Sequence, residues 1–146
     1  MQEDLLENID IPEGKVYTGR MIIISSLFGG ILAGSFMLYQ NFRTFGDNKK
    51  AAMTIVLTIA ALIFIFATFY IPVLADVPSI AYSITFTLLT SYAVSKTQAA
   101  LITKHITGNG KIYSGGRAVL ICIIAVLVIM IPLMLAFLLQ DAVVSR

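Results

Sequence analysis

The sequence has few charged residues and four long stretches with none at all. Only 12% of its 146 residues are charged and 58% are apolar, whereas a soluble domain is about a quarter charged. Charge is missing from residues 21–39, 51–75, 77–95 and 118–140, and the mean hydropathy is +0.91. Too few polar side chains are present to cover a surface in water. This excludes an ordinary soluble domain and indicates an integral membrane protein in a lipid bilayer.

Residues that form catalytic and metal sites are also scarce. The chain has one cysteine, Cys122, and one histidine, His105, which excludes an intrachain disulfide and a zinc site made of cysteines. No Asp or Glu lies between Val77 and Gln140, so His105 has no nearby carboxylate for a metal site or general base. Neither glycine-rich segment matches a nucleophile or phosphate-loop motif. We expect no enzymatic activity, no metal and no cofactor, and the net charge of +2 gives no reason to expect nucleic acid.

The uncharged stretches predict the fold class. Each is close to the roughly 20 residues that a helix needs to cross a bilayer, and helices satisfy their own backbone hydrogen bonds in lipid. We therefore expect an all-α membrane protein with four transmembrane helices, over about residues 21–40, 51–72, 78–96 and 117–140. They form a single domain, residues 21–146, after an acidic tail, residues 1–20. An acidic start is unlike a signal peptide, so we expect the first span to be retained.

The distribution of lysine and arginine predicts an orientation. Four spans place the loops at residues 40–50 and 96–117 on one side, with seven basic residues, and leave three on the side of the termini. The positive-inside rule then places the loops in the cytoplasm and both termini on the extracytoplasmic side. We expect a multi-pass protein of the cell inner membrane.

Small residues recur every four positions in the first predicted span. They form two adjacent rows, Ser25, Gly29 and Ala33 beside Ser26, Gly30 and Gly34. Such a face lets another helix approach closely. It serves either packing inside the monomer or association with a second copy or with other membrane protein subunits.

Hydroxyl side chains recur in the same way in the third predicted span, at Ser83, Thr87, Ser91 and Ser95. Hydroxyls at this spacing share one side of a helix. They either bond to the backbone and a neighbouring helix or line a water-filled path. Apart from Lys96 and Arg117 at their ends, the spans contain no charged residue, which argues against a proton-coupled transporter.

Two motifs resemble those of a family of small bacterial integral membrane proteins that has no established activity. The segments are FGGILAGSFMLYQNFRTFGDNKK, residues 28–50, and QAALITKHITGNGKIYS, residues 98–114. The matching residues are Gly29, Gly30, Leu32, Ala33, Gly34, Asn41, Phe42 and Gly46 in the first segment and Gln98, His105, Gly108, Gly110 and Lys111 in the second. Ile31 replaces the usual proline and Asn109 separates the paired glycines. The resemblance implies a bacterial membrane protein and no particular chemistry.

The two motifs also suggest a polar cluster at the cytoplasmic face, formed by Asn41, Arg43, Gln98 and His105. Such a cluster either binds a lipid phosphate or a partner loop, or caps the ends of the chain's own helices. Without a catalytic constellation, we expect a non-enzymatic protein that acts by helix-mediated association, as a self-assembling or accessory subunit of a membrane complex. The alternatives are a small oligomeric channel or transporter lined by the hydroxyls of the third span, and a membrane-embedded immunity or inhibitor protein.

Overall fold

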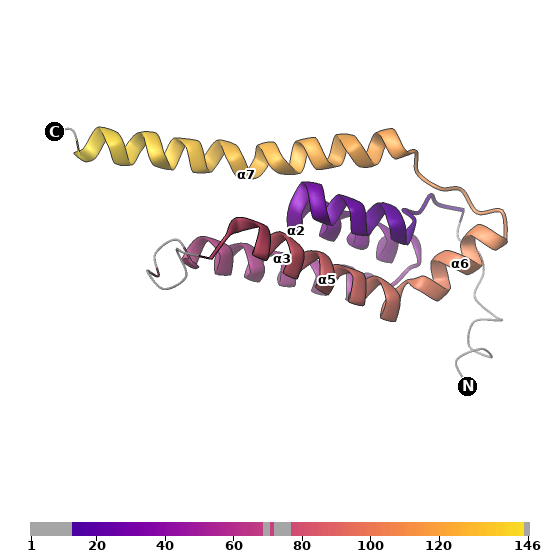
Figure 1. Ribbon diagram of the computed structural model, residues 1–146. Helices are drawn as coiled ribbons and strands as arrows, with labels where there is room; N and C mark the ends of the chain where they lie inside the picture. Colours follow the sequence, from indigo (N-terminus) through magenta and orange to yellow (C-terminus); the bar gives the residue numbers. More distant parts are fainter. Residues whose placement is uncertain (1–12, 69–70, 72–76, 145–146) are drawn as a thin grey trace.

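The computed structural model describes residues 13–68, 71 and 77–144 (Figure 1). These residues form helices and no strand, apart from one isolated bridge between Val16 and Ile112. The helices are α2 (Gly19–Thr44), α3 (Asn48–Thr68), α5 (Ser79–Thr97), α6 (Ala99–Thr107) and α7 (Gly115–Val144). The predicted all-α class is confirmed for the described part of the chain.

Helix α2 is broken at Gly30. This residue has φ 65° and ψ −164°, a backbone conformation that glycine adopts at no steric cost. The two halves, of about 11 and about 14 residues, turn back on each other, so that a methyl group built on Gly34 would lie 2.8 Å from Cβ of Ser26. In a straight helix, positions eight residues apart are about 12 Å apart along the axis. Helix α2 is therefore a helical hairpin with its tip at Gly30, as Figure 1 shows.

The hairpin changes the prediction for the first span. Three helical segments are long and apolar enough to cross a membrane, by length and composition: Gly19–Thr44, Asn48–Thr68 and Gly115–Pro132. At 1.5 Å per residue, however, the two halves of α2 reach only about 16 and about 21 Å, less than the roughly 30 Å of a hydrocarbon core. The prediction of one continuous helix over residues 21–40 is wrong at Gly30, because the backbone reverses there.

The hairpin is the centre of the fold. Helices α3, α5 and α7 all contact α2, with α3 and α5 on one side and α7 on the other (Figure 1). One end of the molecule, which we call the loop end, contains most of the connections between helices (Figure 1). It is formed by the start of α2, residues 45–47, the junction of α5 with α6, and residues 108–114. Helix α7 starts at the loop end and runs to the opposite end, so the start of α2 and the end of α7 lie at opposite ends of the described structure (Figure 1).

Burial is concentrated near the loop end. The core cluster consists of Tyr17, Ile22, Met37, Leu38, Val94, Ile102 and Ala118. In contrast, large apolar side chains of α3 and α7 remain exposed, including Val56 at 64% and Met134 at 63%. Apolar surface on this scale needs lipid around it, which agrees with a membrane protein. Helix α5 is not one of the three helices that are apolar enough to cross a membrane, because hydroxyl side chains interrupt its apolar sequence. It nevertheless packs against the hairpin.

Candidate functional site

A buried polar network closes the base of the hairpin. The backbone N–H of Tyr17 donates to Oδ1 of Asn41 at 2.7 Å, and Nδ2 of Asn41 donates to the carbonyl of Tyr17 at 2.8 Å. The same Nδ2 donates to Oε1 of Gln98 at 3.1 Å. Thr44 adds a bond from its hydroxyl to the carbonyl of Lys15 at 3.2 Å. One amide side chain therefore joins the segment before α2, the end of α2 and the end of α5.

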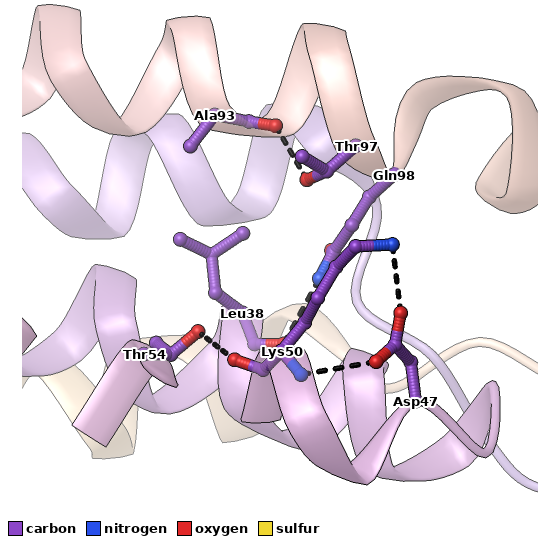
Figure 2. A network of polar contacts seen from close by, with 7 residues as sticks. All are labelled: Leu38, Asp47, Lys50, Thr54, Ala93, Thr97 and Gln98. Atoms are coloured by element: carbon purple, nitrogen blue, oxygen red, sulfur yellow. Dashed lines mark hydrogen bonds and ion pairs between the residues drawn. The ribbon is translucent and has the colours of Figure 1, made fainter. Parts of the chain in front are cut away.

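Gln98 extends this network to the middle of the second hairpin half. Its Nε2 donates to the carbonyl of Leu38 at 3.0 Å, and Figure 2 shows the side chain reaching across from the α5–α6 junction. Gln98 has φ −125° and ψ −19°, outside the helical range, and lies between the two helices. Asn41 and Gln98 are both 0% exposed. Buried amides of this kind are stable only when hydrogen-bonded, and here Asn41 bonds to Tyr17 and Gln98 while Gln98 also bonds to Leu38.

His105 is held by the loop that follows it. Its Nε2 lies 3.0 Å from the carbonyl oxygen of Lys111, and the side chain is 2% exposed. A methyl group on Gly110 would overlap the imidazole ring, so glycine is required at that position. The loop is fixed to the segment before α2 because Val16 donates to the carbonyl of Lys111 at 3.1 Å and Tyr113 donates to that of Val16 at 3.0 Å.

The predicted cytoplasmic cluster is therefore only partly brought together. Asn41 and Gln98 are hydrogen-bonded to each other, while His105 bonds to the backbone of Lys111. Arg43 is exposed in the last turn of α2. The hydrogen bonds of the amides and the imidazole go to other parts of the chain, and Gln98 makes no side-chain capping bond at the end of α5 or the start of α6. Sequence reasoning missed Tyr17, whose part in the network is played by backbone atoms that no residue pattern marks.

The small-residue rows of α2 lie inside the chain. Ser26, Gly29, Ala33 and Gly34 are buried, and Gly30 forms the hairpin tip. A methyl group on Gly29 would lie 2.9 Å from Cα of Cys122, so glycine allows α7 to approach the hairpin backbone. Two uses of the rows are visible: the halves of α2 pack together at Gly34 and Ser26, and α7 packs at Gly29.

The hydroxyls of α5 do not act as one stripe. Ser83 accepts through its carbonyl a bond of 2.7 Å from the Thr87 hydroxyl, while Ser91 is half-buried and Ser95 is exposed. The interhelical bond is made by Thr90, whose Oγ1 accepts from Oγ of Ser26 at 3.1 Å. Thr90 flanks the predicted stripe, so the residue that links α5 to the hairpin was outside the predicted set.

An apolar cavity of about 420 Å³ lies at the hairpin tip. Helices α2, α3, α5 and α7 all line it, through residues that include Gly30, Phe66, Ser83 and Met130. This volume lies within the roughly 300–1,000 Å³ of small-molecule sites. A second cavity, of about 460 Å³, lies between α2, α3 and α5. Ser83 lines the first cavity and none of the four stripe residues lines the second.

Two ionisable groups at the loop end have shifted pKa values. Burial raises the pKa of Tyr17 above its usual value, although the charge of Arg117 and a hydrogen bond to its side chain act in the opposite direction. Hydrogen bonds from the side chain and backbone of Lys50 lower the pKa of Asp47, with Nζ of Lys50 2.7 Å from Oδ2 of Asp47 (Figure 2). Among the described residues, no three His, Cys, Asp or Glu side chains are grouped to hold a metal ion.

Comparison with known proteins adds no further assignment. No family model matches the chain, and no curated protein or solved structure is significantly similar to it.

Proposed function

We propose that this chain is a multi-pass membrane protein without enzymatic activity that acts by helix-mediated association, either with itself or as an accessory subunit of a membrane complex. The observation that carries the proposal is the hairpin tip. The break at Gly30 lies beside an open apolar cavity, and a Cβ built on Gly30 would have no neighbour within 4 Å.

The tip exposes backbone groups that lipid does not satisfy. At a helix break, the last carbonyls of one half and the first N–H groups of the next lose their intrahelical partners. Non-helical backbone at membrane depth is tolerated only where protein or water covers it. Gly30 at the tip of α2 lines the same cavity as Val126, Ile129 and Met130, which lie within the uncharged run of α7. A helix from a second copy or from another subunit, seated in the cavity at the tip, would provide this cover.

The same reading proposes a topology. Helices α3, α5 and α7 cross the inner membrane, and α2 enters and leaves on the side of the loop end. Nine of the ten Lys and Arg residues then lie at the loop end, in or beside its loops and helix ends: Lys15, Arg20, Arg43, Lys49, Lys50, Lys96, Lys104, Lys111 and Arg117. The positive-inside rule places that end in the cytoplasm. In the predicted topology with a crossing first helix, Lys15 and Arg20 lie on the extracytoplasmic side, against the positive-inside rule, whereas the hairpin keeps both at the cytoplasmic end.

The test is the mass of the particle extracted from native membranes in mild detergent. We expect the protein mass of this particle, counted without bound detergent and lipid, to exceed the 15.9 kDa of one chain. Met130→Trp fills the cavity from α7 and should reduce the particle mass, because the bulky ring takes the place of the incoming helix. Val119→Trp is the matched control, since Val119 is 60% exposed and does not line the cavity. A wild-type particle of a single chain would rule out association.

A channel or transporter is the second candidate, and one observation favours it. Ser83 and the broken backbone at Gly30 line the same cavity, so water could satisfy the tip in place of a partner helix. Ser83→Leu should then abolish solute flux in reconstituted vesicles and leave the particle mass unchanged. Flux that is equal in wild type and Ser83→Leu vesicles would exclude this path.

A further inference from the structure

The second cavity is a groove between α3 and α5, completed by the second half of α2. Both helices pack against α2, and within the described ranges they are not in extensive contact with each other. The groove has a volume of about 460 Å³, and its walls are mainly apolar, with Leu38, Leu57, Phe86 and Leu89 among them. Walls of this kind suit an apolar occupant.

Hydroxyl groups in the groove are hydrogen-bonded within their own helices. Thr54 donates to the carbonyl of Lys50 at 2.8 Å, and Thr58 donates to that of Thr54 at 2.7 Å. On the opposite wall, Thr97 donates to the carbonyl of Ala93 at 2.6 Å. These hydroxyl protons need no acceptor from an occupant, which favours a hydrocarbon chain over a polar ligand.

The groove is about as long as one leaflet of a bilayer. It extends over residues 31–42 of α2, 50–61 of α3 and 86–97 of α5. Each stretch rises about 16 Å along its helix, which is close to half of the roughly 30 Å hydrocarbon core. In the proposed topology the groove therefore runs from the membrane surface at the loop end to about the middle of the bilayer.

Basic residues surround the groove at the loop end. Lys50 lines it, and Arg43 and Lys96 are both exposed and each neighbour a lining residue in the sequence. The acidic side chain in the turn between α2 and α3, Asp47, already pairs with Lys50 at 2.7 Å. Figure 2 shows this end, with Lys50 and Asp47 on one side and Thr97 on the other. Three cations beside one carboxylate leave the end positive, so it attracts an anionic headgroup.

We propose that this groove binds an anionic phospholipid of the cytoplasmic leaflet. One acyl chain lies between α3 and α5, and the phosphate contacts Lys50 at the membrane surface. The inference rests on the proposed topology, which places the loop end in the cytoplasm, and it does not depend on association. The groove is distinct from the cavity at the hairpin tip, although Ile31 and Phe86 line both.

The experiment is native mass spectrometry of protein delipidated in detergent and titrated with phosphatidylglycerol or phosphatidylcholine. It counts chains and lipids separately, so loss of the lipid is distinguishable from loss of association. We expect the wild type to bind phosphatidylglycerol more tightly. Ala61→Trp fills the inner part of the groove and should weaken binding of both lipids about five-fold or more, because the acyl chain loses its space. Ala60→Trp makes the same change at an exposed neighbour that does not line the groove, and should change binding less than two-fold.

A second pair of variants tests the headgroup contact. Lys50→Gln should weaken binding of phosphatidylglycerol about five-fold, since one basic residue near the membrane surface contributes roughly this factor. Lys49→Gln removes the same charge from an exposed neighbour that does not line the groove, and should change binding less than two-fold. Equal losses in these two variants would show general charge attraction and overturn the proposal. Equal binding of the two lipids by the wild type would do the same.

The filling variants also decide what occupies the groove. Equal effects of Ala61→Trp and Ala60→Trp would overturn the proposal. Fewer chains per particle in Ala61→Trp alone, with lipid binding unchanged, would show that the groove holds a partner helix instead. A wild-type particle of one chain that shows the expected lipid losses would rule out association and support the lipid site. Circular dichroism melts show that each variant is folded, and Leu57→Trp fills the same groove if Ala61→Trp is not.

Discussion

Tyr17 and Asn41 exchange two hydrogen bonds, of 2.7 and 2.8 Å, although they are 24 positions apart. Along a straight helix, 24 residues cover about 36 Å, so this pair exists only because α2 reverses at Gly30. The pair closes the open end of the hairpin, and the bond from Asn41 to Gln98 fixes α5 to the same point. One asparagine side chain thus joins the two ends of the hairpin to the end of α5.

Replacement of that asparagine should destabilise the protein strongly. Asn41→Leu removes all its hydrogen bonds and leaves the N–H and carbonyl of Tyr17 without these partners, in a site that is 0% exposed. We expect a loss of about 3 kcal/mol, since each unsatisfied buried group costs roughly 1–3 kcal/mol. The measurement is thermal unfolding in detergent, followed by circular dichroism. Asn48→Leu, at an exposed asparagine, should stay within about 0.5 kcal/mol of wild type.

A side chain at Gly29 should push α7 away from the hairpin. In Gly29→Ala the new methyl group would lie 2.9 Å from Cα of Cys122, and this neighbour is backbone that cannot rotate away. Overpacking of this kind costs about 1–3 kcal/mol. Cys122 is the only cysteine, so the rate at which a maleimide labels it reports the separation of α2 and α7. We expect faster labelling in Gly29→Ala and no change in Gly116→Ala, which has open space over its Cα. Slower or equal labelling in Gly29→Ala would contradict the packing.

The hydrogen bond between Ser26 and Thr90 should appear as a coupling in a double-mutant cycle. The 3.1 Å bond joins the hairpin to α5. The cycle removes its donor in Ser26→Ala, its acceptor in Thr90→Val, and both in the double variant. Such bonds between membrane helices contribute about 0.6 kcal/mol on average and at most about 1.7 kcal/mol. We expect a coupling energy in this range from unfolding in detergent. A cycle with Thr87→Val in place of Thr90→Val should give no coupling, because Thr87 donates to the carbonyl of Ser83.

Acid should weaken the turn between α2 and α3. Hydrogen bonds from Lys50 lower the pKa of Asp47 in the folded protein, so the carboxylate contributes stability above its unfolded pKa. That contribution is lost as the pH falls from about 4 through the lower folded value. The side chain is 32% exposed, so we expect an effect below about 1 kcal/mol. Unfolding of wild type and Asp47→Asn should differ at pH 6 and converge near pH 2. A difference that persists at pH 2 would exclude ionisation of Asp47 as the cause.

The helical class and much of α3, α5 and α7 were predictable because uncharged stretches of membrane length have few other solutions. The hairpin was not predictable in the same way. Residues 21–39 are equally apolar whether the chain crosses or turns back, and the difference lies in one φ angle at Gly30. The paired glycines indicated close packing and did not indicate what packs against them.

The network at the loop end was predictable only in part. Asn41 and Gln98 were expected at one membrane face, where polar side chains near helix ends belong, and the structure bonds them to each other. Tyr17 and Thr90 were missed for different reasons. Tyr17 acts through backbone atoms that all residues share, and Thr90 was one of several hydroxyls whose partners depend on the position of the hairpin.

The central claim is that α2 turns back at Gly30, and disulfide formation between its two ends tests it most directly. In a Cys122→Ala background, Lys15→Cys and Thr44→Cys are introduced together, because the hydroxyl of Thr44 lies 3.2 Å from the carbonyl oxygen of Lys15. Oxidation in intact membranes, trypsin cleavage after Arg20 and Arg43, and mass spectrometry then detect any linked peptides. The hairpin predicts linkage in most chains, and none in the control Lys15→Cys/Phe28→Cys, whose second site is beside the tip. A continuous spanning helix would separate residues 15 and 44 by about 40 Å, so absence of the linked peptide would contradict the hairpin.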